Sequence, residues 1–138
     1  MVPLLQETAD WLGATVNSDA EAEQRVQAGL PAATVQRFLD KGLTRSEVFS
    51  LVLPLRTWMH RKNRRQPLSV TESEHALRIA RVLARASVVL GTRQAALAWA
   101  RAPKERFEGR KPMTLLATEP GARMVEEMLV QIDEGMFA

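Results

Sequence analysis

Apolar residues recur along this chain at the three- and four-residue spacing of a helix face. The clearest short example is the set Val35, Phe38 and Leu39, which would lie together on a helix that runs up to Gly42. A longer stretch presents a broader apolar surface, formed by Leu77, Ile79, Ala80, Leu83, Ala84 and Val88. No segment shows the alternation of apolar and polar positions that a half-buried strand needs, so the pattern predicts an all-α fold.

Residues that start and stop helices divide this pattern into segments. Thr44 and Glu47 form a Thr-x-x-Glu capping box, and Thr71 with Glu74 is interpreted as a second one. Asp19 is expected to cap an earlier helix. The expected helices cover residues 4–11, 19–29, 31–42, 45–52, 54–64, 71–90, 93–101, 113–117 and 120–133.

The segment Gln66-Pro67-Leu68-Ser69 interrupts the helical pattern near the middle of the chain. Proline stops a helix because it lacks an amide N–H and its ring clashes with the preceding turn. We therefore expect two helical domains, residues 1–68 and residues 69–138. No internal repeat and no low-complexity segment occurs in the sequence.

The composition is typical of a soluble globular protein. Apolar residues make up 46% and charged residues 25% of the 138 positions, which is too apolar for a disordered chain. No run approaches the roughly 18 uninterrupted apolar residues that a membrane span needs. The start Met-Val-Pro-Leu-Leu lacks the basic region and cleavage site of a signal peptide, so a cytoplasmic location is the default expectation.

The sequence offers little catalytic chemistry. Cysteine is absent, which excludes disulfides, thiolate nucleophiles and thiolate metal ligands. The two histidines, His60 and His75, stand far apart without patterned carboxylates, so no metal site is expected, and His75 is interpreted as a surface or capping residue. No glycine-rich phosphate loop occurs, and no nucleophile, base and orienting group come together. We expect neither a cofactor nor catalysis.

The net charge of +3 hides a strong asymmetry. Residues 1–53 carry −3 and residues 103–138 carry −2, whereas residues 67–102 carry +3 and residues 54–66 carry +5 with no acid. Positive charge gathered on one short segment is typical of a nucleic-acid contact. The basic cluster at 61–65 would also suit an ordinary solvated face, and both interpretations stay open.

The helices expected at 44–53 and 54–64 have the dimensions of a helix-turn-helix. On the second helix, Leu55, Trp58, Met59 and the stem of Lys62 are expected to lie toward the core. The opposite face would enter the major groove, and the N-terminus of the preceding helix would favour a phosphate. The candidate DNA-binding residues are Thr44, Ser46, Arg56, Thr57, His60, Arg61 and Arg64. One such helix binds weakly, so recognition argues for a homodimer.

The last segment, residues 107–138, is apolar and helix-like up to its end at Met136, Phe137 and Ala138. Chain ends are usually frayed and polar, so an apolar end is expected to be covered. Gly135 would let the backbone turn after the last helix. Either a partner protein covers this end, or the end folds back onto its own domain.

Several motifs in this half follow one another in a familiar order. They are Gly109-Arg110-Lys111-Pro112, Leu115-Leu116-Ala117-Thr118-Glu119, Gly121-Ala122-Arg123, Val125-Glu126-Glu127-Met128-Leu129 and Glu134-Gly135-Met136-Phe137. Over about residues 77–138 the chain thereby resembles the toxin-binding domain of the Xre/MbcA/ParS type II antitoxins. The family's usual acid in the second motif is Ala117 here, so no role is assigned to that position.

A looser similarity covers residues 29–69. Its motifs are Gly29-Leu30-Pro31, Leu53-Pro54-Leu55-Arg56-Thr57 and Pro67-Leu68-Ser69. They resemble the N-terminal Xre-like helix-turn-helix of the same antitoxins, although the turn Val52-Leu53-Pro54 lacks a glycine that many members have. The two resemblances together imply an all-α protein with an N-terminal Xre-like helix-turn-helix bundle and a C-terminal helical toxin-binding domain.

The resemblance also implies a function. Such an antitoxin represses its own operon and commonly neutralises a RES-domain toxin that consumes NAD or transfers from it, with its C-terminal end blocking the NAD cleft. A cleft that binds pyrophosphate should attract the acidic residues, and Met136 and Phe137 would be the buried anchors. The toxin-binding candidates are Arg110, Lys111, Asp133, Glu134, Gly135, Met136, Phe137 and Ala138.

The competing interpretation is a free-standing helical transcription regulator whose C-terminal domain serves only dimerisation. Under either interpretation, the apolar surface at Leu83 and Val88-Val89-Leu90 is a plausible seam between two copies. A co-transcribed toxin gene beside this one would favour the antitoxin.

Overall fold

The computed structural model describes residues 4–136, and every regular element in that range is helical. The elements are α1 (Leu4–Leu12), α2 (Asp19–Ala28), α3 (Ala33–Asp40), α4 (Arg45–Leu51), α5 (Leu55–Asn63), α6 (Val70–Leu90), α7 (Arg93–Ala100), the 3-10 turn η1 (Glu105–Phe107), α8 (Pro112–Leu115) and α9 (Glu119–Asp133). The all-α prediction is confirmed, and the expected boundaries differ from these by one or two residues.

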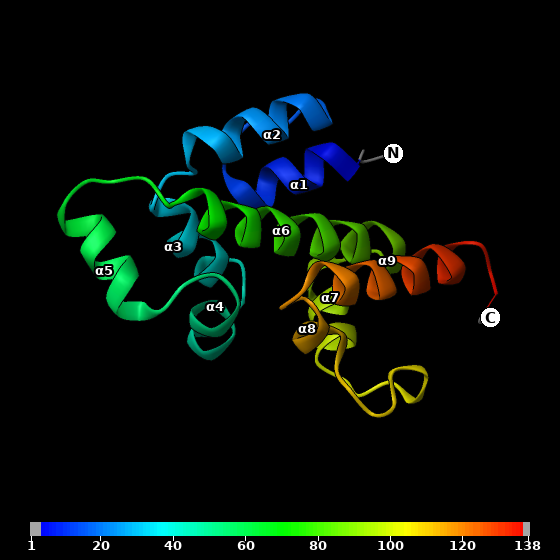
Figure 1. Ribbon diagram of the computed structural model, residues 1–138. Helices are drawn as coiled ribbons and strands as arrows, with labels where there is room; N and C mark the ends of the chain where they lie inside the picture. Colours follow the sequence, from blue (N-terminus) through cyan, green and yellow to red (C-terminus); the bar gives the residue numbers. More distant parts are fainter. Residues whose placement is uncertain (1–3, 137–138) are drawn as a thin grey trace.

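Helix α6 is the axis around which the others pack (Figure 1). It has 21 residues and is therefore about 30 Å long. Helix α1 lies along one side of it and α9 along another, and α2 and α7 also contact it. This crowding explains why Leu83, in the middle of α6, is only 1% exposed. The expectation that Leu83 contributes to a dimer seam is wrong, because its own chain already buries it.

The buried apolar side chains form one continuous cluster that extends from Trp11 to Leu129. The start of α6 is tied to the loop before α3, since the Leu68 amide donates to the Leu30 carbonyl at 2.8 Å and the Leu30 amide donates to Ser73 Oγ at 2.9 Å. Helix α6 therefore packs against helices of both expected domains: α1 and α2 before the boundary, and α7 and α9 after it. The division at residues 68 and 69 stays a prediction about the sequence.

Of the three expected helix caps, one is present and two are corrected. Thr44 and Glu47 make the reciprocal capping box of α4, while Thr92 and Thr118 cap α7 and α9. The α6 box is formed by Ser69 and Glu72 instead of Thr71 and Glu74, and Ser18, not Asp19, caps α2. In both corrected cases an equivalent capping residue lies one or two positions earlier, and the helix extends to it.

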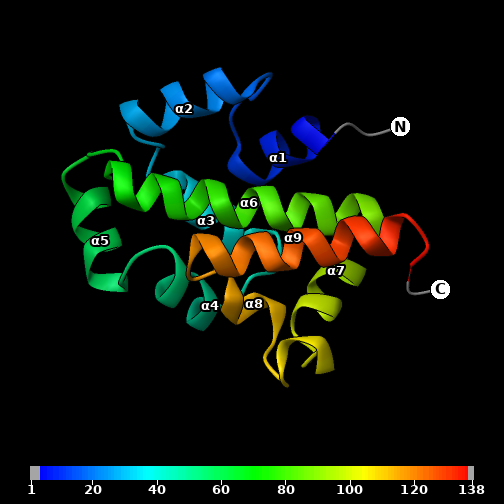
Figure 2. The ribbon, with the colours of Figure 1, turned by 45° about the vertical axis from the view of Figure 1, so that its right-hand side comes forward.

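The pair α4–α5 and the end of α9 lie at opposite ends of α6 (Figure 2). Helices α4 and α5 sit beside the start of α6, whereas α9 runs along α6 and ends near its C-terminus. They therefore lie at the two ends of a helix that is about 30 Å long. Within residues 4–136, no helix is both long enough and apolar enough to cross a membrane.

Candidate nucleic-acid interface and C-terminal tail

The turn between α4 and α5 closes without a glycine. Val52 ends α4 with φ −100° and Pro54 precedes α5 with φ −63°, and Leu53 between them is also outside the left-handed region. Val52 and Leu53 are both buried, and His75 on α6 holds the Val52 carbonyl through Nδ1 at 3.1 Å. His75 is therefore a partly buried residue that fixes this turn. Because no position needs a positive φ, the missing glycine does not alter the turn.

Trp58 anchors α5 to the rest of the molecule. Its indole Nε1 donates to the Ala32 carbonyl at 2.9 Å, and its ring packs on Phe49 of α4 with ring centres 5.6 Å apart. The Lys62 side chain is exposed, and its ammonium lies 3.9 Å from the centre of the same ring. These contacts fix which face of α5 points outward.

The outward face of α5 is a stripe at positions i, i+3, i+4 and i+7, formed by Arg56, Met59, His60 and Asn63. All four side chains are exposed, and we call this set the α5 stripe. The expectation that Met59 lies toward the core is wrong, since its side chain is 52% exposed. Helical geometry places residue 59 about 100° from the buried Trp58, and Lys62 lies over the Trp58 indole.

Of the other candidates on α5, Thr57 is half-buried and Arg64 is exposed just after the last helical turn. Arg61 lies about 140° around the helix from Arg56, so it does not share the α5 stripe. Its guanidinium instead binds Glu72, with Nε 3.1 Å and Nη2 3.2 Å from the two carboxylate oxygens. Arg61 thus joins α5 to the first turn of α6.

Glu72 has a second task, because its carboxylate also accepts the Ser69 amide at 2.8 Å. Burial favours the neutral carboxyl, but the bonds from Arg61 and Ser69 outweigh it and hold the pKa of Glu72 below its ordinary value. Glu72 is therefore ionised at neutral pH. The Arg61 charge is matched by this anion and is less available to an external phosphate.

The N-terminus of α4 is likewise occupied by its own chain. The Thr44 hydroxyl accepts the Glu47 amide at 3.1 Å and the Thr44 amide donates to Glu47 Oε1 at 2.8 Å. A phosphate bound by Thr44 would have to displace the Glu47 carboxylate. Ser46 is exposed, and its candidacy as a phosphate contact stays a prediction.

Arg101, at the end of α7, braces this cap from the C-terminal half of the chain. Its Nε and Nη2 lie 2.9 and 2.8 Å from the two Glu47 oxygens, and Nη2 also donates to the Gly42 carbonyl at 2.7 Å. Burial of Glu47 favours its neutral form, yet the bonds from Arg101 and Thr44 outweigh burial and lower its pKa. The backbone approaches so closely that a Cβ on Gly42 would lie 2.9 Å from Leu97 Cδ1.

Helix α9 ends in a Schellman turn. The Met136 amide donates to the Gln131 carbonyl at 2.9 Å and the Gly135 amide to the Ile132 carbonyl at 3.0 Å, with Gly135 at φ +80°. Asp133 and Glu134 are exposed, and Met136 is 64% exposed, the highest value among the described large apolar residues. The two remaining tail candidates, Phe137 and Ala138, lie outside the described residues.

Arg110 and Lys111 lie in the projecting connection between α7 and α8, and both are exposed. Their main chains shape this connection: the Arg110 carbonyl accepts the Lys104 amide at 3.1 Å, and Lys111 is the N-cap of α8. Their side chains are therefore exposed at the surface. The expectation that they bind a toxin stays a prediction.

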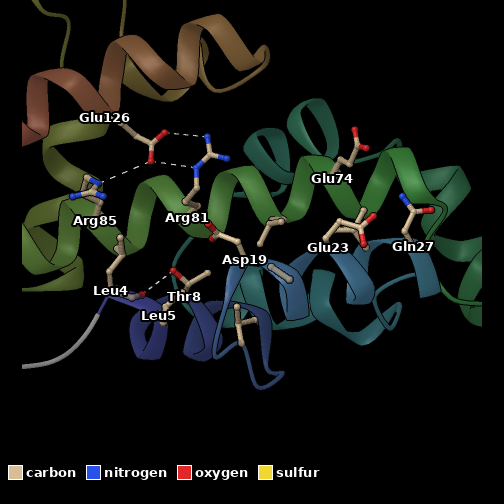
Figure 3. A pocket seen from close by; sticks show the side chains of 14 residues that line it. Leu4, Leu5, Thr8, Asp19, Glu23, Gln27, Glu74, Arg81, Arg85 and Glu126 are labelled. Atoms are coloured by element: carbon tan, nitrogen blue, oxygen red, sulfur yellow. Dashed lines mark hydrogen bonds and ion pairs between the residues drawn. The ribbon is translucent and has the colours of Figure 1, made fainter.

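A cavity of about 460 Å³ lies between α1, α2, α6 and α9 (Figure 3). Its lining combines apolar residues such as Leu4 and Leu77 with paired charges. Arg81 donates to Glu126 at 3.0 Å and to Glu119 at 2.9 Å, and these carboxylates outweigh burial to raise its pKa. The ion pairs join α6 to α9 at one edge of the cavity, and most of its lining comes from α1, α2 and α6.

Two family models match the chain on either side of the middle of α6. The Antitoxin Xre-like helix-turn-helix domain matches residues 21–81, and the Antitoxin Xre/MbcA/ParS C-terminal toxin-binding domain matches residues 85–135. The sequence is 40% identical over 118 residues to Antitoxin Xre of Pseudomonas putida, a match that covers 86% of this chain and 74% of that protein. The chain belongs to the Xre antitoxin family.

The family assignment gives both surfaces a context. The α5 stripe of this Xre-family chain lies inside the helix-turn-helix match. The toxin-binding match ends at residue 135, within the end of α9 and its turn, residues 133–136, which we call the α9 tail. The two domains imply DNA and a toxin as partners. Antitoxins are generally not enzymes, and no cluster of three metal-binding side chains occurs among residues 4–136.

Sequence reasoning missed three residues in this Xre-family chain. Met59 and Asn63 were recoverable, since an i, i+3, i+4, i+7 pattern counted from Arg56 selects both. The role of Arg101 was not recoverable, because it acts on Glu47 across a separation of 54 positions.

Proposed function

We propose that this chain is an antitoxin that inhibits a co-encoded RES-domain toxin by placing its C-terminal tail in the toxin's NAD-binding cleft. The observation that carries the proposal is the exposure of the Met136 side chain. A C-terminal methionine that completed its own core would be buried, whereas Met136 projects from the end of α9 and is 64% exposed. An exposed apolar side chain next to exposed acids suits a cleft that accepts both an aromatic base and a pyrophosphate.

The Schellman turn supports the same proposal. Two main-chain bonds and the positive φ of Gly135 fix the direction in which the chain leaves α9. A tail whose direction is set before binding loses less conformational entropy when the toxin binds it. Asp133 and Glu134 lie next to this turn and would present negative charge at the mouth of the cleft.

We further propose that a homodimer represses the operon by placing two copies of α5 in the major groove. Arg56, His60 and Arg64 supply exposed cationic or hydrogen-bonding groups on a segment that contains no acid. This operator-binding role would use the exposed Arg56 and Arg64, whereas Arg61 is paired with Glu72 and the exposed Lys62 lies over the Trp58 ring.

The test of the toxin-binding role is NAD consumption by the purified toxin titrated with antitoxin variants. Met136→Asp places a charge in the apolar slot and should weaken inhibition by about tenfold or more, which is what loss of one buried methionine costs. Met59→Asp is the matched control, since it changes another exposed methionine at the far end of α6. The melting temperature of both variants should stay near that of the wild type.

If Met136→Asp inhibits the toxin as well as the wild type does, the tail is not the inhibitory element. If no toxin gene lies beside this one and no partner co-purifies, the chain is a free-standing transcription regulator.

A further inference from the structure

Met59 is the apolar member of the α5 stripe, and its position there is the feature that needs an explanation. Isolated exposed apolar residues are common on protein surfaces and carry no meaning alone. Met59, however, stands along α5 between Arg56 and Asn63 on the exposed stripe, about 100° around the helix from the anchor Trp58. Its side chain is 52% exposed, while the neighbouring Lys62 packs over the indole.

The charge around Met59 indicates what kind of partner covers it. Residues 54–66 hold five cations and no acid, and Arg56 and His60 are exposed on the same stripe. A cationic surface around an apolar side chain favours an anionic partner. Duplex DNA meets this requirement, because its major groove contains one apolar group, the 5-methyl of thymine, between two lines of phosphates.

We propose that Met59 reads thymine in the operator by packing its thioether against the 5-methyl group of one base in each half-site. This inference rests on the proposed operator binding and adds a sequence preference to it. Methionine suits the contact because its unbranched side chain is flexible and polarizable. Arg56, one turn away on the same stripe, would bind a guanine edge or a phosphate, and Asn63 would hydrogen-bond an adjacent base edge.

The experiment measures binding of the full-length chain to the DNA upstream of its own reading frame, at fixed salt. Footprinting defines the protected half-sites, and each thymine within them is then replaced, one at a time, by deoxyuridine, which removes only the methyl group. For the wild type, one replacement in each half-site should weaken binding about fourfold, the value of one buried methyl group. The Met59→Ala variant should bind the thymine operator correspondingly less well and should show no loss on that replacement.

The matched control is Met124→Ala on α9, which removes another exposed methionine and should respond to deoxyuridine as the wild type does. The proposal is overturned if no deoxyuridine replacement affects the wild type, or if Met59→Ala retains the full effect. It is also overturned if Met59→Ala leaves DNA binding intact and instead weakens dimerisation or toxin inhibition. Absence of any protected site for the wild type would overturn operator binding as well, which separates the two failures.

Discussion

Helical geometry decides which side chains of α5 are available to a partner. Arg56 and Arg61 are residues of the same type, yet about 140° of helix rotation separates them. Arg56 is exposed on the α5 stripe, whereas Arg61 is bound to Glu72 at the start of α6. The two arginines should therefore respond differently to the same substitution.

We predict that Arg56→Ala lowers operator affinity and reduces the slope of log affinity against log salt by about one if Arg56 contacts a phosphate. Arg61→Ala should leave that slope nearly unchanged and should instead lower the free energy of unfolding by about 1 kcal/mol, since the α6 cap loses a partner. Salt titrations of operator binding and denaturant unfolding of both variants measure these effects. Equal salt slopes for Arg56→Ala and the wild type would contradict the prediction.

Gly121, in the first turn of α9, must lack a side chain because of a close contact and not because of its backbone conformation. Its φ is negative, but an added Cβ would lie 2.1 Å from the Leu115 carbonyl oxygen. The Gly121-Ala122-Arg123 motif noted in the sequence therefore includes a close contact between α8 and α9. This contact lies in backbone atoms, which cannot move aside as a flexible side chain can.

We predict that Gly121→Ala destabilises the fold by about 2–3 kcal/mol, because the α8–α9 packing must open to admit the methyl group. Gly135→Ala is the control: it has a positive φ but open space around it, so it should cost only about 1 kcal/mol. Urea unfolding at neutral pH compares the two. A Gly121→Ala variant as stable as the wild type would show that this contact relaxes freely.

Among the helices, the ties between α4, α5, α6 and α7 are arranged around capping carboxylates. Glu47 caps α4 and is held by Arg101 of α7, while Glu72 caps α6 and is held by Arg61 of α5. Each carboxylate thus satisfies a helix terminus and joins two elements. The orientation of the α4–α5 pair consequently depends on α7, which lies in the matched toxin-binding domain.

These ties predict a dependence of stability on pH. The folded-state pKa values of Glu47 and Glu72 lie below their ordinary value of 4.5, so their stabilisation is present above that pH and is lost as the pH falls through the folded values. Glu47→Gln should cost roughly 1–2 kcal/mol at pH 7 and should make unfolding less sensitive to pH below about 4.5. Denaturant unfolding across pH 3 to 7 tests this; an unchanged pH profile for Glu47→Gln would contradict it.

In the whole molecule, the α5 stripe and the α9 tail lie at the two ends of α6, a helix that is about 30 Å long. Sites at this distance that share no contact partner usually behave independently when mutated.

We predict that Arg56→Ala and Met136→Asp have additive and separate effects. The first variant should lose operator affinity with full toxin inhibition, and the second should do the reverse. The double variant should lose both by the same factors as the single variants. Operator binding and NAD consumption measured on the four proteins provide the check, and a large non-additive term in either assay would show that the two ends communicate through α6.

Much of the architecture was predictable from the sequence because the signals that start and end a helix come from residues close together in the chain. The capping box of Thr44 and Glu47, the stop at Gly91 and the cap at Thr118 involve neighbours within four positions. The errors were small shifts where two capping residues competed, as with Ser69 and Thr71. Arg56 and His60 are exposed, as a DNA-contacting face requires, and their role stays a prediction; the inward placement of Met59 was wrong.

Helical periodicity, capping and the concentration of positive charge at residues 54–66 are properties of local sequence, so they were readable before any coordinates. Which of these side chains are free to bind a partner could not be read from the sequence, because that depends on which side chains from distant positions pack against them. Glu72 engages Arg61 and Arg101 engages Glu47 only once the helices have packed, and the exposure of Met59 follows from Trp58 being anchored to Ala32. Tertiary packing therefore selected, among residues of similar chemistry, those that hold the fold together and those that remain free to bind a partner.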